Sequence, residues 1–553
     1  MSFPSSTQWA RPEHRGYRHP FLFGIHYLGG IGDSPRTLAE LAMSQFSAEL
    51  RRSKDWHTLY MDPNVRDACT EATLDRVWQV KTPSSIAEVK LSRKQIGYVL
   101  DELEGYRKLR QTSCQVSCFE RIWESDSLMG LAQSEALVHS LDSLQDGCTS
   151  DHDGVTTHPI DPKLYCLVYD RTYVTIFDGR PRLLHPPTKT DVYTISREFA
   201  LLPAQVSISA DGSSVKFQSY INNLHTRWHH DVYKGLETLL GALIPLFENV
   251  LTDLHRNNPL KQRIPGRCRY TIWDEPEPPE YSDDEAGWVN YHREMRDWTL
   301  NRPIALPDVP EGGYPGGLEA RKHVVRLRNR SVQVIVSTSE TTLVPGGPGF
   351  ANSPWHVEGM KTERIVACGL HFLEVENITD TSLEFRMAVT YPRGFSAGDT
   401  GATLRTWGLR DGDSCHQHIG DIPIRSGLST VFPNIYQHRQ TSFGLLDPSR
   451  KGYLKVVKFF LVDPDITPAV STAQVAPQQY EWISAALFDA LSSRLPTELI
   501  QQILDKVEGL MTREEAQEYK KRFEDAIEQF TQANNSYHFC IPFDVWNGPD
   551  MAQ

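Results

Sequence analysis

Hydrophobic residues recur at helical spacing along much of the first half of the chain. Thr37-Leu-Ala-Glu40 has the pattern of a capping box, and apolar residues follow it at mixed helical spacing. A second box, from Ser92 to Gln95, opens a segment whose apolar residues lie on one side. Residues 236–254 show helical periodicity again. We therefore expect residues 1–270 to form a mainly helical N-terminal lobe that also contains some strands.

Segments rich in β-branched and aromatic residues predict the strands. In the N-terminal lobe, residues 164–169 and 172–177 predict two strands that pair with each other, and residues 215–221 predict another. Strand patterns then dominate residues 321–470, which we expect to form the β-rich core. The strands predicted in this core are 331–337, 364–373, 382–389 and 454–462.

An acidic, proline-rich stretch separates the two regions. It consists of residues 274–280 and 283–285, and its like charges and prolines favour an extended, solvated chain. We expect residues 271–320 to be an exposed linker, or a lid, between the lobes. Beyond it and the core, helical patterns return over 480–491, from 495 and over 512–532, so residues 471–553 are expected to pack on the core as helices.

Length and composition narrow the class of protein. A chain of 553 residues exceeds what one hydrophobic core usually supports, which indicates two packed lobes. The net charge of −13 makes nucleic acid an unsuitable partner. No stretch approaches the roughly 18–20 apolar residues of a membrane span, and the N-terminus lacks a signal-peptide pattern. Nine scattered cysteines then suggest reduced thiols, and we expect a cytoplasmic protein.

The candidate chemistry begins at Pro354-Trp-His-Val-Glu-Gly359. His356 and Glu358 are two residues apart, so on a strand both side chains point to the same face. An imidazole and a carboxylate on one face are two of the three ligands of a facial triad on iron. A second segment, residues 431–438, ends at His438 and is followed by a turn and the apolar strand 454–462. We expect His356, Glu358 and His438 to bind one metal ion.

This second segment resembles the distal half of prolyl-hydroxylase-like Fe(II)/2-oxoglutarate oxygenases. Across nearly the whole chain, the sequence is similar to a large fungal family of proteins of unknown function. The segments that carry this resemblance are Leu38–Ala42, Ser219–His225, His356–Met360 with Glu363–Ala367, Glu376–Thr379, Phe432–Asn434 with Gln437-His438, and Leu461–Pro464. The resemblance implies an α+β fold whose core is a double-stranded β-helix (a cupin-like jelly roll) flanked by the helical N-terminal lobe and the C-terminal helices.

The resemblance also implies an activity. It is that of a non-haem iron dioxygenase that uses Fe(II), 2-oxoglutarate and O2 to oxidise an unactivated C–H bond of a small molecule. One such substrate is an amino acid of fungal secondary metabolism, with hydroxylation, desaturation or a cyclisation such as aziridine formation as the outcome. The candidates for binding the distal carboxylate of 2-oxoglutarate are, in order, Lys455, Arg364 and Arg450. Two places where the family commonly has arginine hold Leu454 and Leu428 here.

The remaining polar candidates have two interpretations each. Tyr220, Asn222 and His225 are expected to line the pocket together with Trp355, or to serve as strand-end turn residues. Cys415-His-Gln-His418 and His229-His230 lack matched partners, and we interpret both as solvated loops. His371 lies on a predicted strand and is interpreted as a packed histidine, with ligand replacement as the alternative.

Two other functional classes stay open from the sequence. A different metal enzyme on the same barrel, such as a cofactor-free dioxygenase or a zinc hydrolase, would turn over without 2-oxoglutarate. A non-catalytic barrel would bind metal without turnover, and the leucines at expected arginine positions keep this class open. The expected partner is a small-molecule substrate, with neither nucleic acid nor membrane, and the sequence does not predict an oligomeric state.

Overall fold

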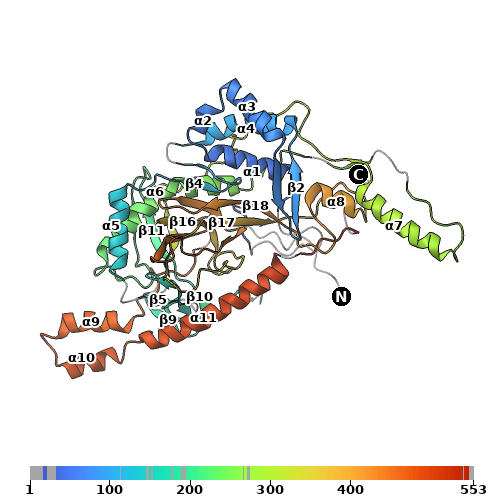
Figure 1. Cartoon of the computed structure of the whole chain (residues 1–553). Coiled ribbons are helices and arrows are strands. Elements are labelled where there is room, and N and C mark those ends of the chain that lie inside the picture. The colour runs from blue at the N-terminus through green and yellow to red at the C-terminus, as the bar shows by residue number, and fades with distance from the viewer. Residues whose placement is uncertain are drawn as a thin grey trace.

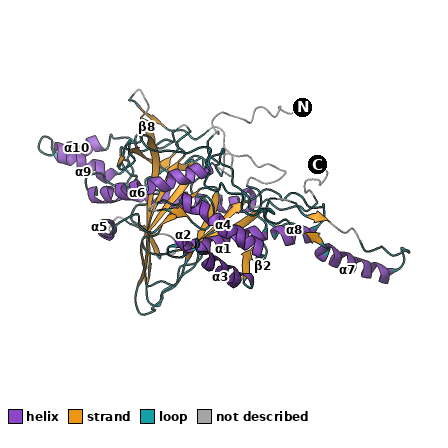
Figure 2. Cartoon of the chain, turned by 90° about the horizontal axis from the view of Figure 1, so that it is seen from above, coloured by secondary structure: helices purple, strands orange, loops and turns teal. Residues whose placement is uncertain are grey.

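The structure is a computed structural model of the chain, and it describes residues 16–20, 33–111, 114–144, 148–150, 154–175, 179–187, 195–265, 267–270, 275–466, 468–539 and 541–546. Both helices and strands occur along these residues, so the fold is of mixed α and β type. Figure 1 shows a central sheet with helices around it. The helix α7 projects from one end of the molecule and the α9–α10 pair projects from the opposite end in both views (Figures 1 and 2).

The largest sheet has ten strands, and the second half of the chain supplies its centre. The order along the sheet is β12-β11-β15-β21-β16-β19-β4-β3, with β6 also pairing with β15 and β5 pairing with β6. These strands are β3 (Gln115–Val116), β4 (Trp123–Ser125), β5 (Thr149–Ser150), β6 (Thr156–His158), β11 (Ala204–Ile208), β12 (Val215–Phe217), β15 (Ser331–Leu343), β16 (Ile365–Glu376), β19 (Ser429–Pro433) and β21 (Gly452–Val462).

A smaller sheet faces this one and has the order β18-β17-β20. Its strands are β17 (Ser382–Ala388), β18 (His416–Pro423) and β20 (Tyr436–Gln440). Residues 353–356 run beside β20, where His356 and His438 form an isolated antiparallel bridge. The side chains between the two sheets form one buried apolar cluster that includes Phe372, Phe385 and Phe460.

Helices cover the outer face of the large sheet. The long helix α6 (His230–Leu254) packs Phe247 and its neighbours against the sheet in a second apolar cluster, which α1 (Leu38–Arg52) and α4 (Arg93–Leu109) also join. Among the described helices, α6 is the one long and apolar enough to cross a membrane by length and composition, and 61% of its most apolar window is buried in the fold. Its apolar residues are thus accounted for by core packing.

The remaining elements are short or peripheral. The helices are α2 (Trp56–Leu59), α3 (Pro63–Leu74), α5 (Leu131–Asp142), α7 (Glu285–Asn301), α8 (Thr400–Trp407), α9 (Tyr480–Leu491), α10 (Thr497–Leu504), α11 (Arg513–Ala533) and the π-helix η4 (Asn534–His538). The two-stranded sheets are β1 (Val77–Lys81) with β2 (Ile86–Lys90), β7 (Leu167–Val168) with β10 (Phe199–Ala200), β8 (Tyr173–Thr175) with β9 (Pro181–Leu183), and β13 (Arg269–Tyr270) with β14 (Ile304–Ala305).

The capping patterns mark helix starts correctly. Thr37 accepts a hydrogen bond from the Glu40 amide at the start of α1, and Ser92 and Gln95 form a reciprocal capping box on α4. Thr512 caps α11 in the same way. The predicted helix 480–491 is α9, and the helix expected from residue 495 begins at Thr497 with Pro496 as its N-cap.

Two local predictions were wrong. The segments 164–169 and 172–177 do not pair with each other, because β7 pairs with β10 and β8 pairs with β9. The end of the acidic stretch, residues 283–285, was expected to be extended, but it leads into a helix. Asp284 caps α7 by accepting a hydrogen bond from the Gly287 amide, and Glu285 begins the helix. The acidic stretch also includes Asp274, which lies outside the described residues.

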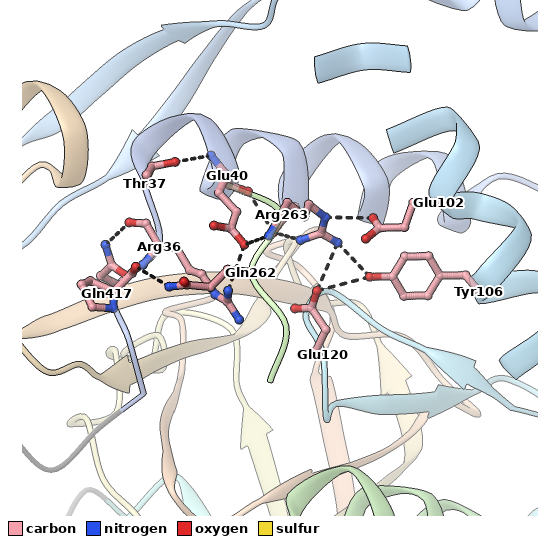
Figure 3. Close-up of polar contacts among 11 residues, drawn as sticks. Arg36, Thr37, Glu40, Glu102, Tyr106, Glu120, Gln262, Arg263 and Gln417 are labelled. Carbon is pink, nitrogen blue, oxygen red and sulfur yellow. Dashed lines mark hydrogen bonds and ion pairs between the residues drawn. The ribbon is translucent and has the colours of Figure 1, made fainter. Parts of the chain in front are cut away.

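A buried polar network ties the N-terminal helices to the segment that follows α6 (Figure 3). The Arg263 guanidinium donates to Glu102 at 2.8 Å and to the Tyr106 hydroxyl at 2.9 Å, and it forms an ion pair with Glu120 at 3.1 Å. The Arg263 amide donates to Glu40 at 2.7 Å. Because Arg263 and Glu102 are both almost fully buried, their charges are compensated within the protein.

Candidate metal centre

Two of the predicted ligands lie directly opposite each other on neighbouring extended segments. The His356 amide donates to the His438 carbonyl at 3.2 Å, and the His438 amide donates to the His356 carbonyl at 3.0 Å. This is a mutual pair of an antiparallel ladder, so both side chains point to the same side of the small sheet. Their ring centroids are 4.3 Å apart.

Glu358 completes the group. Its Oε1 lies 3.6 Å from His356 Nε2 and 3.5 Å from His438 Nε2. The ligand atoms of all three residues lie within 4.8 Å of one another. Three ligands about 2.1 Å from a metal ion lie roughly 3–3.5 Å from one another, so the spacing fits a shared cation. Two imidazoles and one carboxylate are the donor set of a facial triad, which leaves coordination positions open for other molecules.

The orientation of His356 is set by its own backbone. Its Nδ1 lies 2.8 Å from the Pro354 carbonyl oxygen, so Nδ1 carries the proton that it donates there. Nε2 is thereby the ring nitrogen that faces Glu358, and it is the one available to a metal ion once its proton is lost. His438 is buried, and its Nδ1 has no hydrogen-bond partner within the described part of the chain.

The charges of the three groups depend on one another. Burial acts to raise the pKa of Glu358, but the hydrogen bonds and charges of the two imidazoles outweigh it and hold that pKa well below its usual value. Burial acts to lower the pKa of His356, but Glu358 raises it overall. Burial, followed by the charge of His356, lowers the pKa of His438 to about 4. A carboxylate beside a neutral imidazole is ready to accept a cation.

A lysine that the sequence reasoning missed faces the same space. Side chains alternate along β21, with Val456 and Phe460 packing between the two sheets and Val457 and Phe459 packing toward α6. Lys458 therefore points between the sheets, where its positive charge acts to lower the pKa of both His356 and His438. Within the described residues, its ammonium group forms no ion pair.

Lys455, the first choice for binding 2-oxoglutarate, lies on the opposite face of β21. Its ammonium group is 2.8 Å from Asp142 Oδ1 and 3.2 Å from Glu374 Oε2. It is thus neutralised on the outside of the large sheet. The physical reason for this correction is the two-residue period of a strand, which sends Lys455 and Lys458 to opposite faces.

The other two basic candidates are also directed elsewhere. Arg364 precedes β16, where its backbone carbonyl accepts a hydrogen bond from the Asp463 amide and its charge acts on Asp463. Arg450 is exposed and forms an ion pair with Glu376 at 3.1 Å. At the positions where arginine was expected, Leu454 and Leu428 are buried in the core between the sheets.

The hydrogen bonds of the N-terminal pocket candidates lead to residues other than the three ligands. The Tyr220 hydroxyl donates to the Val475 carbonyl, and the Asn222 amide donates to the carbonyls of Pro162 and Leu164. His225 accepts from the amides of Arg227 and Trp228 and stacks on the Trp228 ring. Turn chemistry therefore describes His225, whereas Tyr220 and Asn222 bind backbone carbonyls 255 and 58–60 positions away in the chain.

Trp355 also differs from its expected place. The guanidinium groups of Arg386 and Arg439 both lie over its ring, at 4.7 and 4.6 Å from the centroid. These arginines belong to the outer face of the small sheet, since Phe385 and His438, the residues next to them, face inward. Trp355 is therefore turned away from the metal ligands by the alternation along its own segment.

Other histidines lie apart from the triad. His371 is buried on β16 with its Nδ1 2.8 Å from the Ser429 hydroxyl, which agrees with a packed histidine. The Cys415–His418 segment is not a solvated loop, because His416 to His418 begin β18. His418 lies 3.8 Å from Glu384, which also binds Lys81 and Arg439. The described residues contain no second group of this kind that is arranged to hold a metal ion.

Comparison with solved structures gives distant similarities. The Fe(II)/α-ketoglutarate-dependent dioxygenase TqaL is 8% identical over 76% of this chain and 89% of its own, with a TM-score of 0.25. IDO from Bacillus thuringiensis is 9% identical over 24% of this chain and 49% of its own, with a TM-score of 0.16. The non-haem monooxygenase ThoJ in its nickel complex is 12% identical over 36% of this chain and 67% of its own, with a TM-score of 0.16.

At the level of sequence, no curated protein matches the chain. A family model does match, and it spans residues 93–486. This range includes the central strands of both sheets and all three residues of the triad. The match covers well over half of the sequence, and the chain therefore belongs to the family described as protein of unknown function DUF4246.

Proposed function

We propose that this protein is an Fe(II)- and 2-oxoglutarate-dependent oxygenase. The observation that carries the proposal is the convergence of His356, Glu358 and His438, from two separate segments, within 4.8 Å of one another. The donor set is the one that non-haem Fe(II) oxygenases use, with one face of the metal ion left open. When bound, the iron would supply the activation of O2 that protein side chains alone cannot perform.

We further propose that the two sheets are the walls of a double-stranded β-helix. The chain passes in turn through β15, residues 353–356 (the His356 segment), β16, β17, β18, β19, β20 and β21. The resulting orders are β15-β21-β16-β19 in one wall and His356 segment-β20-β17-β18 in the other. Two four-stranded walls with antiparallel neighbours are the arrangement of an eight-stranded jelly roll.

Lys458 is the proposed partner of the distal carboxylate of 2-oxoglutarate. It projects between the walls, as the ligands do, and its charge acts on both histidines. Ser337 lies opposite Lys458 in the register of β15 with β21, and its hydroxyl group is a second donor on the same face. An ammonium group between apolar side chains attracts a carboxylate more strongly than one in water does.

The protein's own residues would then divide the work. The Pro354 carbonyl keeps the His356 Nε2 free to bind the metal, and Lys458 orients the co-substrate. The apolar side chains between the walls, such as Phe432 and Phe385, exclude water from the site. We propose a small molecule with an unactivated C–H bond as substrate, with an amino acid the first class to test and hydroxylation, desaturation or cyclisation as outcomes.

The test is an assay of the purified chain with Fe(II), 2-oxoglutarate and a panel of amino acids. The components are mixed without oxygen, and the reaction is started by adding oxygen. The expected result is succinate formation that requires 2-oxoglutarate and disappears in His356→Ala and Glu358→Ala. Metal-dependent turnover without 2-oxoglutarate would favour the other metal enzymes on this barrel. If the chain binds the metal ion tightly but forms no succinate with any substrate of the panel, or without one, the result would favour a non-catalytic barrel.

A further inference from the structure

The segment that carries His356 and Glu358 has few backbone hydrogen bonds of its own. Along residues 354–359 it forms one bridge, between His356 and His438, and it is bounded by Pro354 and by Gly359 at a φ of 66°. A proline cannot donate to a ladder, and a positive φ ends an extended segment. Such a segment needs other contacts to hold two metal ligands in fixed places.

One set of contacts comes from Asn434, which follows β19. Its side-chain carbonyl accepts from the Glu358 amide at 2.8 Å, and its side-chain NH2 donates to the Glu358 carbonyl at 2.8 Å. The same NH2 donates to the Ile365 carbonyl at 3.0 Å, and the residue is 1% exposed. The amide thus pairs with the Glu358 backbone as a neighbouring strand would.

The second set comes from the far end of the chain. Asn535, in the π-helix after α11, donates from its NH2 to the Trp355 carbonyl at 2.8 Å. Its side-chain carbonyl accepts from the Gln437 side-chain NH2 at 2.8 Å and from the Arg386 guanidinium at 3.1 Å. Trp355 and Gln437 are the chain neighbours of His356 and His438, so one side chain links the two segments from outside the small sheet.

We propose that Asn434 and Asn535 are positioning residues that hold the backbone of the metal-binding segment, and so fix the relative places of His356, Glu358 and His438. This inference rests on the proposed metal centre and deepens it. Asn434 acts at Glu358 from one side, and Asn535 acts beside both histidines from the other. The C-terminal segment is therefore part of the metal centre, although it supplies no ligand.

The experiment measures the binding of Co2+ alone to the full-length chain, followed by the visible absorption of the bound ion, for Asn434→Ala and Asn535→Ala. The expected result is an affinity for Co2+ lowered roughly 10- to 100-fold, as for other residues that orient metal ligands. The melting temperature of each metal-free variant is recorded beside it. Ser536→Ala, an exposed neighbour on the same turn, is the matched control and should bind Co2+ as the unchanged chain does.

Two further results separate the possible failures. If His356→Ala still binds Co2+ at full affinity, the proposed metal centre is wrong and this inference falls with it. If His356→Ala abolishes binding while the asparagine variants lower only the metal-free melting temperature, the asparagines are merely structural and this inference alone is overturned. Should Asn434→Ala fail to fold, Asn535→Ala decides the question, because Asn535 is half-buried on a terminal turn.

Discussion

Lys455 and Lys458 form a natural pair for testing the site one residue at a time. Both are on β21, but only Lys458 points between the sheets, while Lys455 is paired with Asp142. We expect Lys458→Met to raise the KM for 2-oxoglutarate roughly 30-fold or more, since loss of one partner of a buried charge pair costs about 2 kcal/mol or more. Lys455→Met should leave that KM unchanged.

Steady-state kinetics of succinate formation, with 2-oxoglutarate varied, provide the measurement for this pair. A larger effect of Lys455→Met than of Lys458→Met would show that the assignment by strand alternation is wrong. If Arg364→Ala alone raises the KM, the co-substrate binds nearer to the start of β16.

These residues also show how far the sequence can be interpreted. The spacing of His356 and Glu358 is a local pattern, so it predicts two side chains on one face without knowledge of the fold. Lys458 has a local signal too. It lies two residues from both Val456 and Phe460, which places it on their face of the strand, whereas Val457 and Phe459 lie on the other face. By the same alternation, Lys455 falls on the opposite face of β21. By contrast, nothing near Asn535 in the sequence indicates that it reaches Trp355, since tertiary packing alone brings them together.

His371 provides a prediction about pH and stability. Burial lowers the pKa of this imidazole to about 4, whereas an exposed histidine has a pKa near 6.5. Between these values the unfolded chain binds a proton that the folded chain excludes, so the free energy of unfolding falls as pH decreases from about 6.5 to about 4. The contribution amounts to about 3 kcal/mol when complete.

Urea unfolding of the unchanged chain and of His371→Gln, at several pH values in this window, isolates the effect. The difference in unfolding free energy between the two should change with pH in the stated direction, because the other titrating groups are common to both. A constant difference from pH 6.5 to pH 4 would contradict the exclusion of the proton from the folded imidazole.

At the scale of elements, the contact of α6 with β16 depends on one glycine. A Cβ added at Gly369 would lie 2.7 Å from the Phe247 ring, so this position allows the helix to approach the sheet closely. We expect Gly369→Ala to lower the free energy of unfolding by about 1–3 kcal/mol through overpacking. On α6 itself, Gly241→Ala meets only ordinary contacts with Val215 and should raise it by about 0.5–1 kcal/mol.

Chemical denaturation of both alanine variants measures their free energies of unfolding. The expected changes relative to the unchanged chain have opposite signs. Equal destabilisation by the two substitutions would indicate that the ring of Phe247 moves aside easily. The close approach of helix and sheet would then contribute little to the free energy of unfolding. If Gly241→Ala leaves the free energy of unfolding unchanged, the gain in helix propensity is too small to detect. That result would not bear on Gly369.

The elements themselves were predicted with unequal success, for a physical reason. Helix starts such as those at Thr37 and Ser92 depend on hydrogen bonds within four residues, so the sequence contains the whole signal. Strand partners are chosen by distant contacts. The expected pairing of 164–169 with 172–177 failed because Leu167 and Val168 pair with Phe199 and Ala200 instead.

At the scale of the whole molecule, the buried Arg263 network links α1, α4 and the turn at Glu120 (Figure 3). We expect Arg263→Met to lower the free energy of unfolding by about 3–5 kcal/mol, because it leaves buried carboxylates without a counter-charge. Adding Glu102→Gln to this variant should recover part of the loss. Thermal and urea unfolding of the single and double variants measure both effects.

The matched control is Arg107→Met, which removes an ion pair of similar length with Glu104 on the exposed face of α4. Exposed pairs are screened by solvent, so the melting temperature should hardly change. An equal loss for Arg107→Met and Arg263→Met would mean that burial of the network has no special weight.

The expected boundary near residue 270 falls between strands of one sheet, since β4 pairs with β19 and β11 pairs with β15. During synthesis the ribosome therefore releases the paired strands β3–β4 and β11–β12 well before β19 and β15, the other partners of β4 and β11, exist. Until β15 and β19 emerge, these strands offer open edges to other nascent chains. Folding of this protein during its synthesis should accordingly depend on chaperones. A chain truncated after residue 320 should aggregate.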